Sequence, residues 1–167
     1  VTTGERLREQ LIRDNRFRPE SIVSVPTGID PERFAPADRA QAKARLGLAP
    51  GEACIGIVAT LRSWKGHCYL VDAVANLRRK DARLLVVGDG PGRDNLRQQV
   101  AQLGLQQRVL MPGNQTDVAP WLQALDVFVL PSYANEGVPQ ALMQAMAVGV
   151  PVVSTPVGSI DELVRHE

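Results

Sequence analysis

One acidic residue, Glu136, precedes a nearly apolar segment that has the pattern of a helix. Pro139 suits the first position of this helix, where no N–H is needed, so we expect the amides of Gly137 and Val138 at its mouth. These amides can bind phosphate or sugar oxygens, while Glu136 accepts hydrogen bonds from sugar hydroxyls. Gln144, about two turns further along, can reach another pair of hydroxyls. The alternative is that Glu136 acts only through the helix dipole.

Two cations lie in the segment LRSWKG (61–66), between an apolar run and the start of a helix pattern. Arg62 and Lys65 are therefore expected near a helix N-terminus, which already favours anions. The segment indicates phosphate binding, with a solvated basic loop as the alternative. His67 has no partner at a useful spacing, and we interpret it as a residue at the start of the helix.

The glycine-rich segment GDGPGRDNL (88–96) also follows an apolar run and precedes a helix pattern. Its glycines, Gly90 among them, let the backbone approach a ligand closely. The segment nearly matches the dinucleotide fingerprint, but Arg93 occupies the third glycine position. No acid lies about twenty residues beyond Gly88 to bind a ribose. A dinucleotide dehydrogenase is therefore disfavoured, and a tight turn is the alternative to a ligand-binding loop.

A fourth segment, PGNQTD (112–117), lies between a short apolar run and another helix pattern. Its backbone groups could meet the flat ring of a ligand. The alternative is a structural one, in which Asp117 caps the following helix.

The elements that must position these segments alternate regularly after Gly51. Apolar runs predict strands at 53–61, 83–88, 108–113, 126–131 and 151–155. Amphipathic stretches predict helices at 66–79, 93–104, 117–125 and 140–148, with another beginning at 159. Strands this apolar on both faces predict an α/β, doubly wound, Rossmann-like parallel sheet covered on both sides. Such folds bind ligands beyond the carboxyl ends of their strands, which is where the four segments fall.

Apolar stripes on the helix patterns predict which side chains face the sheet. On the helix at 66–79 the expected stripe includes Leu70, Ala73 and Val74. On the helix at 93–104 it includes Leu96 and Leu103.

Residues 1–50 have a different character and are interpreted as a lead-in to the binding domain at 51–167. Thr2 and Glu5 have capping-box spacing, which predicts a capped helix in TTGERLREQL. The run SIVSV (21–25) predicts a strand, and the residues after it are rich in turn formers. This lead-in is either an edge element of the same domain or a connection to a domain outside the chain.

Composition excludes several classes of function. The net charge of +1 and the aromatic content of 4% argue against a nucleic-acid partner. Cys54 and Cys68 lack the spacing of a zinc site, and we expect two buried thiols in a reducing, cytoplasmic compartment. No run reaches the ~18 apolar residues of a membrane span, and no signal peptide opens the chain. We interpret the sequence as a piece of a longer protein.

Taken together, the motifs resemble the carboxyl-terminal, donor-binding domain of GT-B glycosyltransferases of retaining family 4, the glycosyl transferases group 1. The resemblance runs from about 23 to 164 and rests on VPTGIDPERF, LRSWKG, VVGDGP, PGNQTDV, DVFVLPS and EGVPQALMQAMAVGVPVVSTPVGSIDELV. It implies a two-domain enzyme that transfers a hexose-type sugar from a UDP- or GDP-linked donor to a glycan or lipid-linked acceptor. It implies no metal and no other cofactor, an absent amino-terminal acceptor domain, and a parent protein at the inner face of the cytoplasmic membrane.

The resemblance also assigns roles at the phosphate end of the donor. Lys65 matches a lysine that holds the diphosphate, whereas the family's arginine falls on Thr60, and Arg62 is our candidate to replace it. Glu136 matches the first of two signature glutamates, which contacts the transferred sugar. The implied mechanism is a front-side substitution in which Lys65 stabilises the leaving diphosphate.

At the nucleoside end the chain departs from the family's pattern. The second signature glutamate, which binds the ribose hydroxyls, falls on Gln144, so ribose binding should weaken by ~1 kcal/mol. Gln115 matches the position that meets the base edge, and Glu162 lies in the GG-x-x-E region with Ser159 for its second glycine. Two other functions stay open: a non-catalytic nucleotide-sugar-binding module, and a GT-B sugar-nucleotide epimerase.

Overall fold

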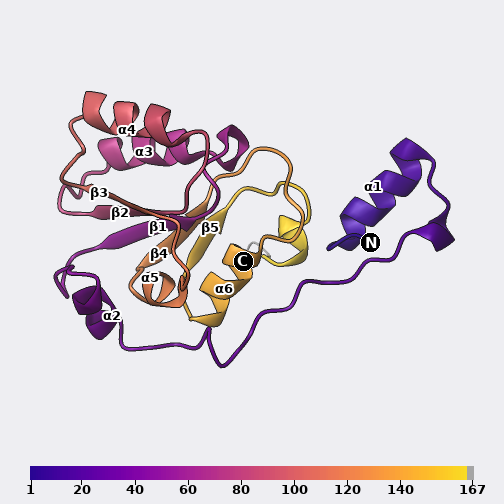
Figure 1. Cartoon of the computed structure of the whole chain (residues 1–167), viewed down its shortest axis with the longest axis horizontal. Helices are drawn as coiled ribbons and strands as arrows, with labels where there is room; N and C mark the ends of the chain where they lie inside the picture. Colours follow the sequence, from indigo (N-terminus) through magenta and orange to yellow (C-terminus); the bar gives the residue numbers. More distant parts are fainter. Residues whose placement is uncertain (165–167) are drawn as a thin grey trace.

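The computed structural model describes residues 1–164 as a five-stranded parallel sheet flanked by helices on both faces (Figure 1). The strands are β1 (Cys54–Val58), β2 (Arg83–Val87), β3 (Val109–Gly113), β4 (Val127–Leu130) and β5 (Val152–Ser154). They are ordered β3-β2-β1-β4-β5, and all four pairings are parallel. The predicted doubly wound, Rossmann-like fold is therefore confirmed.

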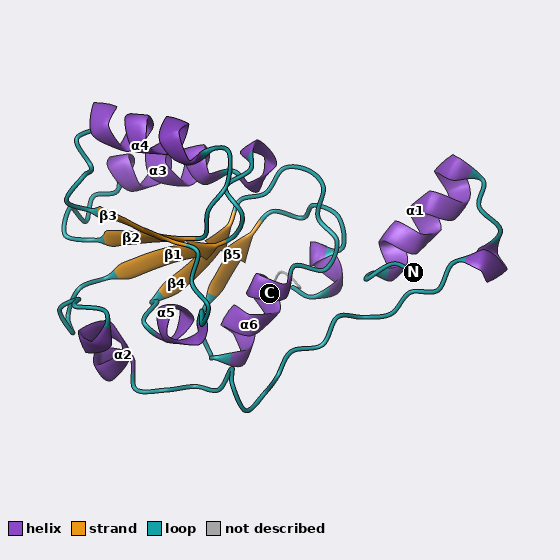
Figure 2. Cartoon of the chain, in the orientation of Figure 1, coloured by secondary structure: helices purple, strands orange, loops and turns teal. Residues whose placement is uncertain are grey.

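Two layers of helices cover the sheet (Figure 2). One face carries α3 (His67–Asn76) and α4 (Arg93–Gln102), and the other carries α2 (Arg39–Arg45), α5 (Ala119–Gln123) and α6 (Gln140–Ala147). Between them lies a core of fully buried apolar side chains that includes Ile57, Leu84 and Phe128. Burial on both faces explains why the strands are almost entirely apolar.

The strand order places a topological switch point between β1 and β4. From β1 the chain adds β2 and β3 on one side, and then crosses to add β4 and β5 on the other side. In doubly wound sheets, ligands bind at the carboxyl ends of the strands near such a switch point, where the loops that leave β1 and β4 lie here. These two loops contain Lys65 and Glu136.

The expected strands and helices between 53 and 155 are all present, with bounds that move by at most three residues. Two side chains predicted to be buried are exposed instead, Ala73 on α3 and Leu103 just after α4. In α3, Val71 is buried in place of Ala73, together with Leu70 and Val74. After α4 the chain turns at Leu103, so Leu105 enters the core in its place. The helix expected from 159 is a short 3-10 helix, Ile160–Glu162, and residues 165–167 lie outside the described part of the chain.

The cysteine prediction is half wrong. Cys54 is fully buried at the start of β1, and burial raises the pKa of its thiol to about 11. Cys68 is exposed, because it lies outside the buried stripe of α3. Within the described residues, no helix is both long and apolar enough to pass through a membrane.

Part of the lead-in packs on the domain. Phe34 and Leu48 are buried and belong to the hydrophobic core. On α2 the buried Lys43 donates from Nζ to an Asp126 carboxylate oxygen at 2.7 Å and to the Glu52 carbonyl oxygen at 2.6 Å. These contacts anchor α2 at the amino ends of β1 and β4.

The first 25 residues lie apart from the sheet (Figure 1). The helix predicted there is α1 (Glu5–Asn15), but none of its residues is buried. The strand predicted at 21–25 is wrong. Ser21 is the last residue of a 3-10 helix, Pro19–Ser21, and the residues after it form only an isolated parallel bridge, between Ser24 and Thr2. No sheet covers this run, so Val23 and Val25 remain exposed.

The predicted capping box of α1 is also wrong. The Thr2 hydroxyl donates to the Gly4 carbonyl oxygen instead of accepting an amide of the helix. The N-cap residue is Gly4, which has no side chain that could form a capping hydrogen bond. Instead, the carboxylate of Glu162 accepts the amides of Glu5 and Arg6 at 3.2 and 3.0 Å. A residue distant in sequence therefore caps α1 and holds its first turn against the domain.

We expect Glu162→Ala to release the first turn of α1. The amides of Glu5 and Arg6 lose their acceptor, which should cost about 1 kcal/mol, the usual value of an N-cap. Hydrogen exchange of the α1 amides should become several-fold faster, with the core unchanged. The matched control is Asp161→Ala, which removes only an exposed ion pair with Arg6 and should change little. Equal exchange in wild type and Glu162→Ala would show that the cap does not hold α1.

Candidate functional site

The loops that follow β1 and β4 are locked together by their backbones. Gly66 has φ +73°, and a β-carbon on it would lie 2.1 Å from the Pro131 carbonyl oxygen. The amide of Tyr133 donates to the Trp64 carbonyl oxygen at 2.9 Å. Only glycine fits such an approach, so this residue fixes the distance between the loops. The side chains on the two loops consequently have defined positions relative to each other.

These loops bring together the two residues predicted to be catalytic. Lys65 Nζ lies 2.7 Å from Glu136 Oε1, and Ser132 Oγ donates to the same oxygen at 2.5 Å. The Glu136 side chain is only 4% exposed, whereas that of Lys65 is 20% exposed. Asn135 adopts a left-handed conformation, φ 54°, which turns the chain so that Glu136 points back to the loop of β1. The result is an acid and a cation in contact at the switch point of the sheet.

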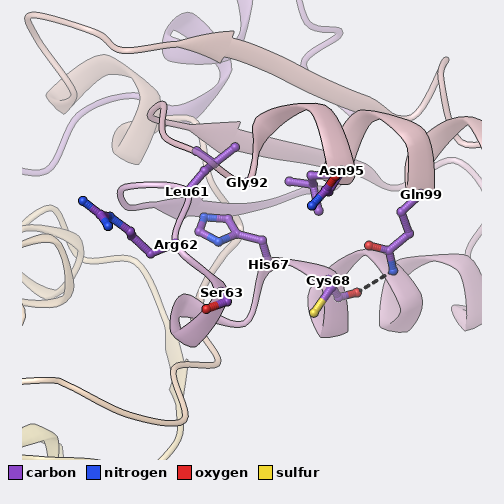
Figure 3. Close-up of a pocket in the computed structure, with 9 residues that line it drawn as sticks. Leu61, Arg62, Ser63, His67, Cys68, Gly92, Asn95 and Gln99 are labelled. Atoms are coloured by element: carbon purple, nitrogen blue, oxygen red, sulfur yellow. Dashed lines mark hydrogen bonds between the residues drawn. The ribbon is translucent and has the colours of Figure 1, made fainter.

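The other predicted phosphate ligands are less closely grouped. Arg62 is exposed and lies over the ring of Trp64, 5.5 Å from its centroid. Figure 3 shows its side chain directed away from His67. Thr60 is exposed on the same loop, and its carbonyl accepts the Arg62 amide at 2.8 Å. Among the described residues, neither side chain forms a hydrogen bond or an ion pair.

The mouth of α6 differs from the sequence prediction by one residue. Pro139 is the N-cap, with ψ 116°, and the helix begins at Gln140. Gly137 and Val138 therefore lie before the first turn. Their amides do not belong to the helix N-terminus, which differs from the prediction. The Val138 amide points to the lead-in, where the Thr3 hydroxyl oxygen accepts it at 3.5 Å.

The glycine-rich loop after β2 packs beside the loop after β1. The Leu61 amide donates to the Asp89 carbonyl oxygen at 3.0 Å, and the Gly92 amide donates to the Leu61 carbonyl oxygen at 2.9 Å. Between them, the amide of Gly90 donates to the Asp89 carboxylate at 2.7 Å. Arg93 forms an ion pair with Asp89 at 2.7 Å, which makes this loop a compact turn.

Comparison with known proteins decides the family. Residues 52–167 match the family model of the glycosyl transferases group 1. The chain belongs to this family.

Relatives of this group 1 chain include two bacterial glycosyltransferases. It is 39% identical over 160 residues to the lipopolysaccharide core biosynthesis mannosyltransferase LpsB of Rhizobium meliloti, covering 88% of the chain and 45% of LpsB. It is 36% identical over 164 residues to the D-inositol 3-phosphate glycosyltransferase of Mycobacterium marinum, covering 94% of the chain and 34% of that protein. The chain thus spans less than half the length of these relatives.

Solved structures agree with the fold. Anabaena Alr3699/HepE in complex with UDP and glucose superposes with a TM-score of 0.89 at 28% identity, over 99% of this chain and 46% of HepE. The carboxyl-terminal domain of LpcC, a glycosyl transferase group 1 protein of Francisella tularensis, superposes with a TM-score of 0.72 at 30% identity. It covers 83% of this chain and 76% of the LpcC domain. The superposition on HepE therefore includes the whole sheet described above.

The predicted nucleoside ligands of this group 1 chain lie on separate elements. Gln144 is half-buried in the second turn of α6, and its side chain makes no hydrogen bond with the described residues. Gln115 folds back on its own loop, where its amide donates to the Asn114 carbonyl oxygen at 3.1 Å. Asp117 lies one residue before Val118, the N-cap of α5, and accepts the Ala119 amide at 3.2 Å, while a hydrogen bond from Arg33 lowers its pKa. The described residues contain no cluster of three or more His, Cys, Asp or Glu side chains suited to a metal.

The sequence did not indicate two features of the site. Ser132 contacts Glu136, but a lone serine after a strand carries no recognisable signal. A cavity of about 240 Å³ lies between α3, α4 and the loop after β1 (Figure 3). It is lined by Leu61, Arg62, Ser63, His67, Cys68, Gly92, Asn95, Leu96 and Gln99. The first residue of α3 is His67, as predicted, and its Nε2 is buried without a partner.

We expect His67 to make stability depend on pH. Burial, with a smaller effect of the Lys65 cation, lowers the pKa of the imidazole from 6.5 to about 4. Between these pH values the unfolded chain binds the proton and the folded chain does not. The free energy of unfolding should therefore fall as the pH falls through this window, by about 3 kcal/mol in all. Urea unfolding of wild type and His67→Gln at about pH 7 and about pH 5 tests this. Identical pH dependence of both proteins would contradict it.

Proposed function

We propose that this chain is the sugar-nucleotide-binding part of a retaining glycosyltransferase that moves a hexose-type sugar from a UDP- or GDP-linked donor to a glycan or lipid-linked acceptor. The observation that carries the proposal is the contact between Lys65 and Glu136 at the switch point of the sheet, 2.7 Å apart. A cation and a nearly buried acid at this place can bind two different parts of the donor. The cation binds the diphosphate, and the acid accepts hydrogen bonds from the sugar.

The relatives support the class of ligand. HepE is described in complex with UDP and glucose, and LpsB is named a mannosyltransferase of the lipopolysaccharide core. Similarity to these two proteins makes a nucleoside diphosphate sugar the first donor to test. Because the chain spans 45% of LpsB, we propose that the rest of the protein supplies the acceptor-binding domain. A lipid-linked acceptor would place the parent at the cytoplasmic face of the membrane.

In the proposed reaction the acceptor oxygen bonds to the anomeric carbon on the face from which the diphosphate leaves, so configuration is retained. The leaving diphosphate oxygen takes the acceptor proton. Lys65 stabilises the charge that develops on the diphosphate, and Arg62 can approach it from the same loop. Glu136 orients the sugar through its hydroxyls and eases positive charge on the ring. Gln115 meets the base, and Gln144 meets the ribose with neutral hydrogen bonds. This scheme uses no metal.

The experiment is a calorimetric and thermal-shift screen of the chain against UDP, GDP, ADP and their sugars. One nucleotide series should bind and raise the melting temperature, because a ligand that binds only the folded state stabilises it. No shift and no heat with any of these ligands would contradict the proposal.

Two other functions make different predictions for the whole protein. A non-catalytic binding module would bind the nucleotide sugar and transfer nothing, and the departures at Thr60 and Gln144 favour it. A sugar-nucleotide epimerase would convert the donor with no acceptor present, which chromatography detects. Transfer that requires an acceptor separates the proposed function from both.

A further inference from the structure

The two carboxylate oxygens of Glu136 have different surroundings. Oε1 receives both described hydrogen bonds, from Lys65 Nζ at 2.7 Å and from Ser132 Oγ at 2.5 Å. Oε2 accepts none from the described residues, yet it is not among their buried polar atoms without a partner. Oε2 is therefore the oxygen that keeps access to the surface, and it is free to accept a hydrogen bond from a ligand.

The two donors to Oε1 differ in how firmly they are held. Ser132 is fully buried just beyond β4, and its carbonyl oxygen accepts a hydrogen bond from the Thr155 hydroxyl just beyond β5. The backbone of Ser132 is therefore fixed where two paired strands, β4 and β5, end, and this fixes the position of its hydroxyl. Lys65 reaches Oε1 through a long side chain that is 20% exposed. A diphosphate near the loop would compete with Glu136 for this ammonium group.

We propose that Ser132 is a positioning residue for Glu136. When Lys65 turns to the diphosphate, the Ser132 hydroxyl keeps its hydrogen bond to Oε1 and prevents the carboxylate from rotating. Oε2 then stays directed at the surface, where it accepts a hydrogen bond from a hydroxyl of the donor sugar. This inference rests on the proposed function, and it makes Ser132 matter for the sugar but not for the nucleotide.

The test compares the affinities of this chain for UDP and UDP-glucose, and for GDP and GDP-mannose, by calorimetry. Ser132→Ala should reduce the preference for the sugar nucleotide over the matching diphosphate about tenfold, as expected for a hydrogen bond to a charged group. Affinity for the diphosphate itself should stay within about twofold. Ser132→Thr keeps the hydroxyl and should restore the preference.

Two controls separate positioning from a general structural role. Ser154→Ala removes another serine hydroxyl, which donates to the Leu130 carbonyl oxygen at 3.0 Å and does not contact Glu136. It should leave the sugar preference unchanged. In a Glu136→Ala background, which removes the acceptor of the Ser132 hydroxyl, adding Ser132→Ala should cause no further loss of preference, because the two changes act through one interaction.

The outcomes distinguish this inference from the proposed function. If wild type binds a nucleotide and Ser132→Ala keeps the same sugar preference, the inference is wrong and the proposed function stands. An equal loss of affinity for diphosphate and sugar nucleotide would also overturn it, because that result indicates a purely structural serine. If wild type binds none of the four ligands, the proposed function fails and the inference fails with it.

Discussion

Glu136→Gln is expected to reduce sugar transfer by the whole protein about 10²- to 10³-fold, the usual effect of losing one preorganised electrostatic group. Glutamine keeps the shape of the side chain and can still accept from Ser132 and Lys65, but it carries no charge. Positive charge that develops on the sugar ring would then lack its nearby anion. The measurement is turnover of the whole protein with a nucleotide sugar and an acceptor.

Nucleotide binding is the control for this variant. Glu136 forms hydrogen bonds with Lys65 and Ser132 and with no other described side chain, so calorimetric affinity for the diphosphate should not decrease. It could rise slightly, because Lys65 would no longer be held by a full negative charge. Wild-type turnover in Glu136→Gln would remove this residue from the reaction, and the proposed division of roles would be wrong.

Lys65→Met is expected to weaken diphosphate binding by about tenfold or more, the value of one charge-assisted hydrogen bond. It should also destabilise the protein. The Glu136 carboxylate is 4% exposed, and without Lys65 it keeps only the hydrogen bond from Ser132. Removing one partner of this ion pair should lower the free energy of unfolding by up to about 3 kcal/mol. The value lies at the low end for a buried pair because Lys65 is partly exposed. Calorimetry and urea unfolding measure the two effects separately.

The structure offers a matched control and a rescue for this variant. Lys43→Met breaks another buried ion pair of the same length, 2.7 Å to Asp126, at the opposite end of the sheet. It should lower stability and leave nucleotide affinity intact. The double variant Lys65→Met, Glu136→Gln should regain much of the stability without regaining affinity. If Lys65→Met binds the diphosphate as tightly as wild type, Lys65 is only a structural partner of Glu136.

The sequence alone was enough to predict the fold. The alternation of fully apolar runs with amphipathic stretches is a local property, and it predicted every strand and α-helix from 53 to 155 to within three residues, but not the 3-10 helix Ser63–Lys65. Turn chemistry and charge also act locally, which is why the loops after β1 and β4 were found as candidate sites. Lys65 and Glu136 could be singled out because each has an unusual chemical setting within a few residues.

Pairings between distant residues were decided only by the tertiary structure. The contact of Lys65 with Glu136 joins residues 71 positions apart, and the capping of α1 by Glu162 spans more than 150 positions. Such contacts depend on strand order and on how closely the backbones approach, as at Gly66, and no local pattern encodes these distances. The same dependence explains the two wrong predictions in the lead-in: Glu162 caps α1 in place of the capping box, and no sheet lies beside 21–25 to pair with a strand.

The sequence therefore determined which residues could do chemistry, and the structure determined which of their atoms are available for it. A carboxylate at the mouth of a helix is visible in a sequence. That one oxygen of Glu136 is held by Ser132 and Lys65, and that the other is left free, follows only from the register of β4 beside β1 and β5. The physical reason is that a hydrogen bond is decided by distances of a few tenths of an ångström, which the packed sheet sets and the local sequence does not.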